Sequence, residues 1–596
     1  MTRPQICARF DDLTSEGSAF ELRGVAAEME AGSLGEVRDV VAAAEQAARS
    51  GAWVAGFVAY EGAPAFDPAL TVRPRGGPLP LAWFGAFDER VDVPPIRPPA
   101  ADRGKGRWRL DWTAEQHARA VAHIKDLLAA GETYQVNLTV RARSVVEDPL
   151  ALYAGMAHAQ GGAYNAYFET RTHAIVCASP ELFFERKDGT VVTRPMKGTR
   201  PRGRWPAEDG AQADALVDSA KDRAEHIMIV DLLRNDLGRL ARPGTVTVDD
   251  LATIERYHTV WQLTSTISAQ LVAGAGLVDI FAALFPSGSV TGAPKPRTMA
   301  RIADLEDRPR GVYCGAVGYL APDVDRGPAR FAVAIRTATV DKVTGEAEYG
   351  SGGGITWSSD AGAEWEEVRH KCAILDPPVR PPGLFETLRV EPDGRPVNLE
   401  RHLDRLESSA GFFAIPFQRE RVDKEVRAAC RAAHRPQRAR VSLAAGGALT
   451  VSLSEFPAVT PGPVRLGLAN QPVDSQDRRL FFKSTDRRRY EEARASRPDV
   501  DDVILCNERG EVTETTIANL AVHLDGRWWT PALPCGLLPG VERGRLIDVG
   551  ELAERVITVD EVRRARRLAV INSLRGWRAA ILVDAATGAG DPWRCG

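Results

Sequence analysis

The chain has 596 residues, of which 44% are hydrophobic and 26% charged, and its formal net charge is only −4. This composition is typical of a soluble globular protein with two large domains or roughly three to four smaller ones, and the balanced charge argues against nucleic acid or an anionic membrane as a partner. The eight cysteines lack C-x-x-C or His/Cys metal-ligand spacing, and we expect no signal peptide, no membrane-spanning segment, and reduced thiols in the cytoplasm.

The first hundred residues mix helical and strand-like segments. Val37–Arg49 is rich in alanine and predicts a helix, and Ala52–Tyr60 predicts a buried strand. Residues 91–107 are dense in proline, glycine and charge, which predicts a surface linker. Thr113 resembles an N-cap and predicts a helix that ends near Ala130.

Strand and helix patterns alternate over residues 131–375. The predicted strands are Ala163–Glu169, Ala174–Cys177, Gly315–Leu320 and Phe331–Ala338. The segment Ser219–Leu240 predicts a helix. Its expected apolar face consists of Ile227, Val230, Leu233 and Leu237.

A proline-rich stretch then indicates a domain boundary. After it the pattern restarts with a predicted strand at Leu384–Val390 and a predicted helix at Asn398–Phe412. No internal repeat is visible, so we expect two unrelated domains of α/β (α+β) class. The predicted domains are residues 1–375 and 384–596, joined by a linker at 376–383.

One lysine of the first domain, Lys197, lies in the sequence PMKGTRPRG at 195–203, directly after the strand-like residues 190–193. Glycine and proline at this density predict a tight loop. A lysine in such a loop is either part of a solvated basic turn or a buried nucleophile with a lowered pKa. The loop alone leaves both interpretations open.

Two acidic pairs stand at helical spacing, Asp222 with Glu225 and Glu364 with Glu367, and Lys371 follows the second pair four residues later. At this spacing the members of each pair face one direction. Two such faces could hold Mg2+, which needs only one or two protein carboxylates beside substrate oxygens. A solvated helix surface is the alternative.

Two segments rich in small residues, 287–295 and 350–355, are interpreted as loops. Such loops bring backbone N–H groups close to carboxylate or phosphate oxygens. The second does not fit G-x-G-x-x-G, because Ile355 occupies the last glycine position. A dinucleotide-binding site is therefore not indicated.

Several collinear motifs resemble the chorismate-utilising enzymes, strongly over about residues 110–375 and loosely before that. The motifs lie at 179–181, 195–203, 224–239, 287–297, 336–338, 350–356 and 364–371. This family includes anthranilate synthase component I, aminodeoxychorismate synthase component I, and isochorismate and salicylate synthases. The resemblance implies an α/β fold and a Mg2+-dependent substitution on the ring of chorismate.

The resemblance also implies a role for each matching residue. Glu181 would be the general acid that helps the C4 hydroxyl leave. Magnesium would be held by Glu225 and Glu367, with Asp222 and Glu364 beside them. The implied substrate-binding residues are Thr291, Tyr313, Arg336, Gly352, Gly353 and Lys371.

Lys197 distinguishes between members of the family. Anthranilate synthases resemble this motif but carry alanine there, whereas aminodeoxychorismate synthases carry a lysine that adds to ring C2 so that ammonia enters at C4. The resemblance therefore implies 4-amino-4-deoxychorismate as the product. No cysteine lies in a glutaminase-like context, so ammonia is expected from a separate glutamine amidotransferase subunit or from free ammonium.

The second domain contains a comparable lysine, Lys483, at the end of the apolar run 480–482. Glu514 lies on a predicted strand after a hairpin turn at 508–510. A lysine beside a carboxylate that can pair with a pyridine nitrogen is what a pyridoxal-phosphate site requires. A surface ion pair is the alternative.

The motifs at 384–389, 399–410 and 536–546, with the Lys483 and Glu514 segments, resemble the fold-type IV pyridoxal-phosphate (PLP) enzymes. These include branched-chain and D-amino-acid aminotransferases and aminodeoxychorismate lyase. The resemblance implies that Lys483 holds pyridoxal 5'-phosphate covalently and that Glu514 pairs with its pyridine nitrogen. The implied phosphate-binding residues are Arg405 and the backbone around Ile517, Ala518, Val541 and Glu542.

Residues 381–383 stand where family members have lead-in strands, which affects the edge through which a homodimer is expected. The expected overall function is conversion of chorismate and ammonia to 4-amino-4-deoxychorismate, followed by loss of pyruvate to give 4-aminobenzoate for folate biosynthesis. Two alternatives stay open. The synthase could serve a secondary-metabolite route with a C-terminal aminotransferase, or residues 380–596 could be a non-catalytic scaffold.

Overall fold

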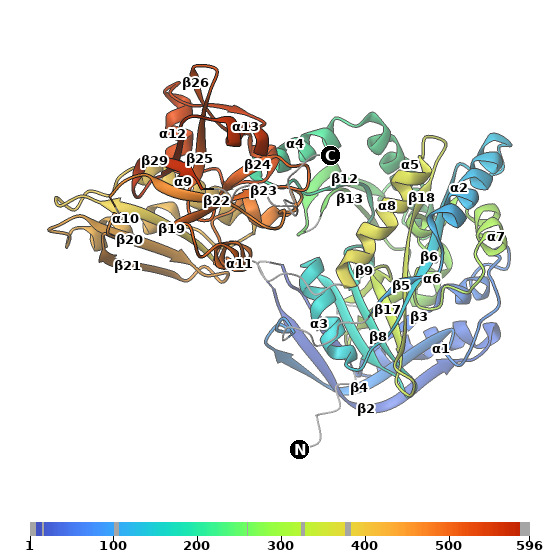
Figure 1. Cartoon of the computed structure of the whole chain (residues 1–596). Coiled ribbons are helices and arrows are strands. Elements are labelled where there is room, and N and C mark those ends of the chain that lie inside the picture. Colours follow the sequence, from blue (N-terminus) through green and yellow to red (C-terminus); the bar gives the residue numbers. More distant parts are fainter. Residues whose placement is uncertain are drawn as a thin grey trace. The chain divides into compact units, whose positions relative to one another are not determined.

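The computed structural model describes residues 8–14, 17–99, 107–258, 260–323, 328–375, 383–459 and 461–583. Contacts divide the chain into two compact units (Figure 1). The first unit consists of Met1–Arg202 and Gln212–Pro378, and the second of Gly203–Ala211 and Val379–Gly596. Most of the linker predicted at 376–383 lies outside the described residues.

The first unit is built on one network of hydrogen-bonded strands, β1–β18, whose pairings among the described residues are all antiparallel. The strands are β1 (Ala8–Asp11), β2 (Ala19–Ala31), β3 (Trp53–Val58), β4 (Ala82–Val93), β5 (Arg109–Leu110), β6 (Gln135–Val145), β7 (Tyr164–Glu169), β8 (His173–Ser179), β9 (Leu182–Lys187), β10 (Thr190–Arg194), β11 (Met196–Pro201), β12 (Thr247–Arg256), β13 (Val260–Gln270), β14 (Gly292–Ala293), β15 (Ala316–Leu320), β16 (Ala329–Val333), β17 (Thr337–Asp341) and β18 (Glu346–Ile355).

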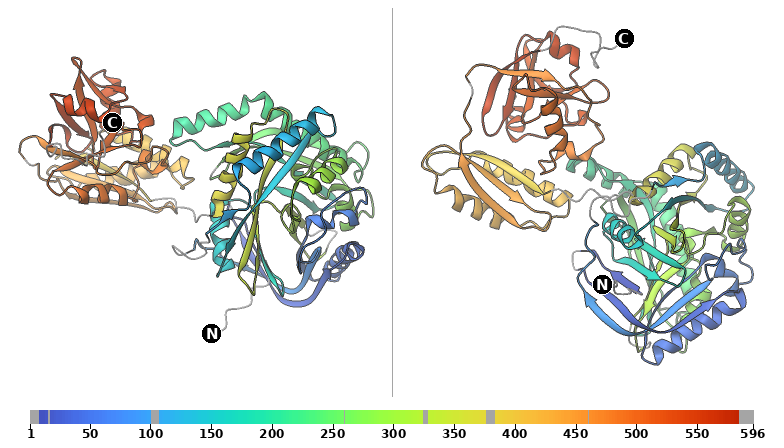
Figure 2. Two further views of the ribbon diagram at one scale, coloured as in Figure 1. Left: turned by 45° about the vertical axis from the view of Figure 1, so that its right-hand side comes forward. Right: turned by 60° about the horizontal axis from the view of Figure 1, so that its bottom comes forward.

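Helices cover this network, and Figure 2 shows one of them, α1, along strands β2 and β4. The helices are α1 (Leu34–Arg49), α2 (Ala114–Ala129), α3 (Pro149–Gln160), α5 (Ala220–Gly238), α6 (Leu277–Leu284), α7 (Lys295–Leu305) and α8 (Ala361–Cys372), with short 3-10 helices η1 (Tyr60–Ala65), η2 (Gly288–Val290) and η3 (Ala373–Leu375). Helix α4 (Pro206–Val217) begins in the segment Gly203–Ala211 of the second unit and ends in the first. The largest core packs the apolar faces of α1, α5 and α6 against β3, β4, β13, β15 and β16. In the described part of the chain, none of the helices has the length and apolarity that a membrane crossing requires.

The second unit contains two separate sheets. The three-stranded sheet consists of β19 (Leu384–Val390), β20 (Gln437–Leu443) and β21 (Leu449–Glu455). The eight-stranded sheet consists of β22 (Val464–Leu468), β23 (Asp502–Cys506), β24 (Val512–Thr515), β25 (Asn519–Leu524), β26 (Arg527–Pro531), β27 (Ala553–Arg555), β28 (Leu568–Asn572) and β29 (Gly576–Leu582). The helices are α9 (Leu399–Phe412), α10 (Arg419–Cys430), α11 (Arg488–Ser496), α12 (Val541–Asp548) and α13 (Val559–Arg564), with η4 (Arg478–Phe481) and η5 (Leu533–Cys535).

Most predicted elements are confirmed, because their periodicity and caps are strong. Val37–Arg49 lies within α1, and Thr113 caps α2 by accepting a hydrogen bond from the backbone N–H of Gln116 at 3.3 Å. The predicted strands at 163–169, 174–177 and 315–320 correspond to β7, β8 and β15, and the second unit begins with β19 and α9 as expected.

Four predictions about local structure are wrong, three of them at single strands or side chains and the fourth at the glycine-rich segment 350–355. The expected strand Phe331–Ala338 is two strands, β16 and β17, because Arg336 adopts a φ of 52° that interrupts the extended chain. The segment expected to be a tight loop around Lys197 is largely strand β11. Ile227 was expected on the buried apolar face of helix α5, but it is 45% exposed, and Ile229, two residues later, is buried in the core instead.

The glycine-rich segment 350–355 is also not a loop, because it forms the end of β18 and pairs with β6. Its glycines are required by close approach of side chains. A Cβ atom at Gly350 would lie 2.1 Å from the ring of Tyr313, and one at Gly354 would lie 2.7 Å from the Nζ atom of Lys197. The glycines here leave space for the side chains of Tyr313 and Lys197 and do not form a turn.

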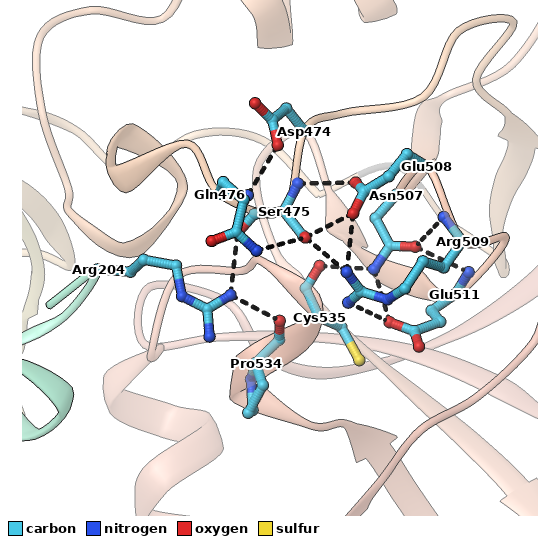
Figure 3. Close-up of polar contacts among 10 residues, drawn as sticks. All are labelled: Arg204, Asp474, Ser475, Gln476, Asn507, Glu508, Arg509, Glu511, Pro534 and Cys535. Carbon is cyan, nitrogen blue, oxygen red and sulfur yellow. Dashed lines mark hydrogen bonds and ion pairs between the residues drawn. The ribbon is translucent and has the colours of Figure 1, made fainter. Parts of the chain in front are cut away.

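The short segment Gly203–Ala211 belongs to the second unit through Arg204 and Trp205. Figure 3 shows the Arg204 guanidinium beside the backbone carbonyls of Ser475 and Pro534, to which it donates hydrogen bonds of 3.2 and 3.4 Å. The Trp205 ring lies against Phe481, with 5.0 Å between ring centroids. This assignment was not predictable from the sequence, since the contacts join residues about 270 positions apart.

We predict that Trp205→Ala loosens the part of the second unit around Phe481. The half-buried indole would be replaced by a cavity, and the local opening free energy would fall by about 1–3 kcal/mol. Amide hydrogen exchange of peptides spanning Arg478–Phe482 measures this. The control is Trp357→Ala, which removes a 66% exposed indole of the first unit and leaves those peptides unchanged. If these peptides exchanged equally slowly in both variants, the contact between Trp205 and Phe481 would not stabilise this region.

Candidate active sites

The first cavity lies within the first unit, where strands β11 and β18 meet helices α5 and α8. It brings together the predicted residues Glu181, Lys197, Asp222, Glu225, Tyr313, Arg336, Gly352, Gly353, Glu364, Glu367 and Lys371. Thr291 does not line it, because its hydroxyl donates instead to the backbone carbonyls of Ser287 and Gly288 at 3.1 and 3.4 Å.

Lys197 points into this cavity from an irregular position of β11. The strand is bulged between Lys197 and Thr199, and Gly198 has a φ of 75°, a conformation that favours glycine. Bulges next to active sites commonly re-aim a side chain. The bulge therefore explains how a lysine on a strand reaches the cavity.

The environment of Lys197 lets its amine lose a proton more easily than a lysine in water does. Burial lowers the pKa of Lys197, and the nearby Lys371 ammonium lowers it further. Attraction from Glu225 and Glu367 acts in the opposite direction without cancelling the effect. A lysine that loses its proton more easily than usual is a better nucleophile.

Glu181 is the complementary group, because it holds its proton more tightly than usual. It is 3% exposed, and burial raises its pKa to about 7, although the Ser289 hydroxyl and Lys197 act to lower it. Near neutral pH the carboxyl group is therefore part protonated and can donate a proton into the cavity. Ser289 was not identified from the sequence, since only the fold brings η2 beside Glu181.

The other carboxylates of the first cavity are only partly neutralised. Lys371 Nζ lies 2.5 Å from Glu367 Oε1 and donates to the carbonyl of Gly352 at 2.7 Å. Glu225 accepts from the Thr356 hydroxyl at 3.1 Å. Lys371 lowers the pKa of Glu367, whereas burial and repulsion from Glu367 raise the pKa of Glu364.

A divalent cation would relieve this repulsion. Within the residues that the structure describes, no group of three or more metal-ligating side chains is assembled for a metal. However, a Cβ atom at Gly353 would lie 3.2 Å from Glu364 Oε2 and 3.6 Å from Glu367 Oε1, so both carboxylates approach one point of the backbone. One or two carboxylates, with the rest supplied by substrate and water, is the arrangement that Mg2+ prefers.

Arg336 and Tyr313 offer donors for an anionic ligand. Arg336 lines the cavity, and its guanidinium makes no hydrogen bond or ion pair with any other described residue. Tyr313 is 7% exposed, and the guanidinium carbon of Arg141 lies 5.1 Å from the centroid of the Tyr313 ring. A free guanidinium at the wall of a cavity suits bidentate binding of a carboxylate.

The second cavity lies within the second unit and has a volume of about 370 Å³, against about 150 Å³ for the first. Its size is within the range of small-molecule and cofactor sites. It contains the predicted residues Arg405, Lys483, Glu514, Ile517, Ala518 and Val541. The side chain of Glu542 is not part of its wall, because it pairs with Arg545 at 2.8 Å at the start of α12.

Lys483 is positioned by the edge of the three-stranded sheet. The backbone N–H of Phe385 donates to the carbonyl of Lys483 at 3.0 Å, and the Lys483 Nζ atom lies 5.0 Å from the Phe385 ring centroid. Burial lowers the pKa of Lys483 to about 8, and Arg405 adds to this. A carbonyl compound bound in the cavity would meet an amine that is readily deprotonated.

Glu514 on β24 is 4% exposed, and its carboxylate accepts a hydrogen bond from the Tyr490 hydroxyl at 2.8 Å and from the backbone N–H of Leu538 at 3.2 Å. Burial raises its pKa to about 7. A buried cation or a protonated ring nitrogen beside Glu514 would therefore stabilise its ionised form. Tyr490 carries no sequence signal for this role, because α11 has an unremarkable polar pattern.

Arg405 is oriented by a buried ion pair. Its Nε and one terminal nitrogen donate to Glu386 at 2.8 and 2.6 Å, and Glu386 also contacts His402 Nδ1 at 2.7 Å. Burial alone would raise the pKa of Glu386, but the Arg405 guanidinium and the His402 ring hold it well below its usual range. The other ring nitrogen of His402 lies 2.7 Å from the Ser573 hydroxyl, which lines the same cavity. Ser573 and the start of α12 therefore add polar groups beside Arg405 that could bind phosphate.

Each unit matches a known protein family. Residues 8–376 match the family model described as chorismate binding enzyme, and residues 383–581 match amino-transferase class IV. The chain is 39% identical over 271 residues to aminodeoxychorismate synthase component 1 of Bacillus subtilis, covering 45% of this chain and 57% of that protein. It is 37% identical over 323 residues to anthranilate synthase component 1 of Streptomyces coelicolor, covering 54% and 61%.

The chain thus spans less than two thirds of the length of these curated relatives, and their names differ in the activity they state. Among solved structures, anthranilate synthase component I from Streptococcus pneumoniae is similar with a TM-score of 0.53 and 24% identity, covering 60% of this chain and 92% of that chain. This likeness supports the fold of the first unit.

We predict that Glu386→Ala strongly destabilises the second unit. The change leaves Arg405 and His402 buried without their anion, which costs about 3–5 kcal/mol of unfolding free energy. Because the folded pKa of Glu386 is depressed, its contribution is complete above the ordinary glutamate pKa of about 4.3 and is lost as the pH falls towards the folded value. Urea unfolding at pH 7 and pH 4 measures both effects.

The matched control is Glu455→Ala, which removes a carboxylate that is 78% exposed and pairs with Arg435 at the surface. We expect no measurable change from it. If Glu386→Ala were as stable as this control, the buried pair would not organise the site.

Proposed function

The chain belongs to the chorismate-binding enzyme family, and on this premise we propose that it converts chorismate and ammonia to 4-amino-4-deoxychorismate and then removes pyruvate to give 4-aminobenzoate for folate biosynthesis. One observation carries the proposal. Lys197 lines the same cavity as Glu181, and burial shifts the two groups in opposite directions, lowering the pKa of the Lys197 amine and raising the pKa of the Glu181 carboxyl group to about 7. This is the pairing that a displacement through a lysine nucleophile needs.

In the first step the chain's own residues bind, attack and protonate. Arg336 binds a carboxylate of chorismate, and Lys371 and the Tyr313 hydroxyl lie at the same wall. The Lys197 amine adds to ring C2 while Glu181 gives its proton to the departing C4 hydroxyl. Ammonia then enters at C4 and Lys197 is released. Splitting the displacement in two avoids one difficult direct substitution.

Magnesium fits the acidic side of this cavity. Glu225, Glu364 and Glu367 would hold it, and it would supply a positive charge against the ring carboxylate. Lys371 and Thr356, which now contact Glu367 and Glu225, would have to release these oxygens to the cation. We infer that chorismate and Mg2+ bind together.

In the second step Lys483 would hold pyridoxal 5'-phosphate, which would supply an electron sink for breaking bonds at the substrate. Glu514 would pair with the pyridine nitrogen, and Arg405 with the backbone at Ile517 and Ala518 would bind the phosphate. The Lys483 amine would accept a ring proton of the substrate. Loss of enolpyruvate then leaves an aromatic ring, which drives the reaction forward.

The partners follow from this chemistry. We propose a separate glutamine amidotransferase as the source of ammonia, because aminodeoxychorismate synthase component 1 is, by its name, one component of a larger enzyme. We also propose that the protein acts in the cytoplasm and that the second unit forms a homodimer, as the sequence led us to expect.

The proposal is tested by product analysis with lysine variants. Wild-type protein, supplied with chorismate, Mg2+, ammonium and PLP, should release 4-aminobenzoate and pyruvate. Lys197→Ala should lower amination by at least about 100-fold while retaining Mg2+-dependent chorismate binding. Lys483→Ala should accumulate 4-amino-4-deoxychorismate and lack the visible absorbance band of lysine-bound PLP.

The matched controls are Lys187→Ala in the first unit and Lys424→Ala in the second, both of which remove an exposed lysine outside the cavities. Formation of anthranilate by the wild type would refute the role of Lys197. Accumulation of 4-amino-4-deoxychorismate by the wild type, with a PLP band present, would identify the second unit as another PLP enzyme. The same accumulation without that band would identify it as a scaffold.

The pKa of Glu181 predicts a pH limit for amination. Because its folded pKa is about 7, the acid form should decline about tenfold per pH unit above this value, and the amination rate should decline with it. Rates are measured at a constant concentration of unprotonated ammonia. Glu181→Gln should be slower by about 100-fold or more and lack this limb. A Glu181→Gln variant with the wild-type profile would remove Glu181 from the mechanism, and Glu185→Gln on β9 serves as the control.

A further inference from the structure

The second cavity contains three arginines that have no part in holding PLP, namely Arg438, Arg440 and Arg575. Two come from the three-stranded sheet, and the third follows β28 of the eight-stranded sheet. Neither the motifs of the sequence nor the proposed cofactor site accounts for them. Their surroundings indicate which ligand they bind.

Strand β20 places two of the arginines on one face. Ala439, Val441 and Leu443 alternate with them and are buried against α9 and α10. Arg438 and Arg440 therefore lie on the opposite face, which lines the cavity. The two arginines do not contribute to packing of the core, because the sheet packs against α9 and α10 through its other, apolar face.

Arg440 lies close to the reactive lysine. Its guanidinium stacks on the ring of Phe385 at 4.0 Å from the centroid, and the Lys483 Nζ atom lies 5.0 Å from the same centroid. Arg440 makes no hydrogen bond or ion pair with another described side chain. Two cations against one ring repel each other, and an anion between or beside them would offset this repulsion.

Arg575 carries the clearest mark of a missing partner. Its Nε atom is buried and has no hydrogen-bond acceptor in the described part of the chain. Burial lowers the pKa of Arg575, and the positive charges of Arg578 and Arg438 lower it further, while attraction from Asp502 acts in the opposite direction. A buried donor without an acceptor is costly, so native sites usually supply the acceptor with a ligand or water.

The carboxylates of the same cavity are already engaged. Asp486 pairs with Arg479 and Arg488 at 3.4 and 3.1 Å, and Glu514 accepts from Tyr490. The cavity wall thus has no acidic group left for the three arginines, and Arg438 finds only the Ser454 hydroxyl, at 3.0 Å.

We propose that Arg438, Arg440 and Arg575 form a receptor for the two carboxylates of a dicarboxylate amine, which restricts the second site to dianionic substrates. This inference rests on the proposed function, since 4-amino-4-deoxychorismate carries one carboxylate on the ring and one on the enolpyruvyl group. Guanidinium groups bind carboxylates bidentately and hold the ring in one orientation. An amine with an apolar side chain would leave the arginines unpaired and is disfavoured.

Three variants test the receptor, namely Arg440→Gln, Arg575→Gln and Arg440→Lys. With purified 4-amino-4-deoxychorismate, we expect each glutamine variant to raise the KM of pyruvate release about 10- to 100-fold, with a smaller change in kcat. Arg440→Lys should recover part of the affinity through its charge alone. The visible PLP band and the affinity for PLP should not change. Arg435→Gln, which removes a surface arginine paired with Glu455, is the control.

The outcomes separate this inference from the proposed function. If the wild type holds PLP but forms no 4-aminobenzoate, the proposed function fails, and the receptor is then tested with glutamate and aspartate against alanine as amino donors, through bleaching of the PLP band. A preference for the dicarboxylic donors that both glutamine variants lose supports the receptor. A KM within twofold of the wild type, no preference among donors, loss of PLP by the glutamine variants, or a wild type that binds no PLP would overturn it.

Discussion

Each unit depends on keeping the amine of one lysine largely out of water. Removing an ammonium group from water costs several kcal/mol, so a lysine is retained in such a place only if carboxylates lie near it or if it gives up its proton. Lys197 and Lys483 combine both solutions, since each has a lowered pKa and each is attracted by glutamates of its cavity. The surrounding elements bring those glutamates near the amines, and a lysine with a lowered pKa is suited to act as the nucleophile that we propose.

The backbone positions the lysine side chain differently in the two units. In the first, a bulge in β11 turns Lys197 inward, and the glycines of β18 clear the space that its side chain and Tyr313 occupy. In the second, Lys483 is held by a backbone hydrogen bond to β19, whose next residue, Glu386, anchors Arg405. The reactive group is thus attached to the sheet in both cases. Rigid strands position a side chain more accurately than loops can.

Elements with a strong period or cap were predictable from the sequence, as α1, α2 and β7 show. The irregular parts were not. Glycines usually interrupt strands, so a run of them suggested a loop, and only the proximity of Tyr313 and Lys197 explains why β18 carries them. The motifs indicated where most lining residues of the two cavities would be. They could not indicate Ser289, Tyr490 or Arg575, because these reach their cavities only through tertiary structure.

The two cavities differ in charge although the proposed chemistry gives both a dianionic substrate. Lining groups of the first comprise five carboxyl groups, Glu181, Asp222, Glu225, Glu364 and Glu367, against the four cationic side chains Lys197, Lys221, Arg336 and Lys371. Burial raises the pKa of Glu181 and of Glu364, so this wall is close to balanced in charge, and in the proposed first step Mg2+ would add the positive charge that a dianion needs. The second cavity has an excess of arginine and lysine over acidic side chains and attracts the same kind of ligand directly. Because basic side chains outnumber Asp486 and Glu514 there, the second cavity suits a cation less than the first does, which is consistent with the proposal of Mg2+ in the first cavity and PLP in the second.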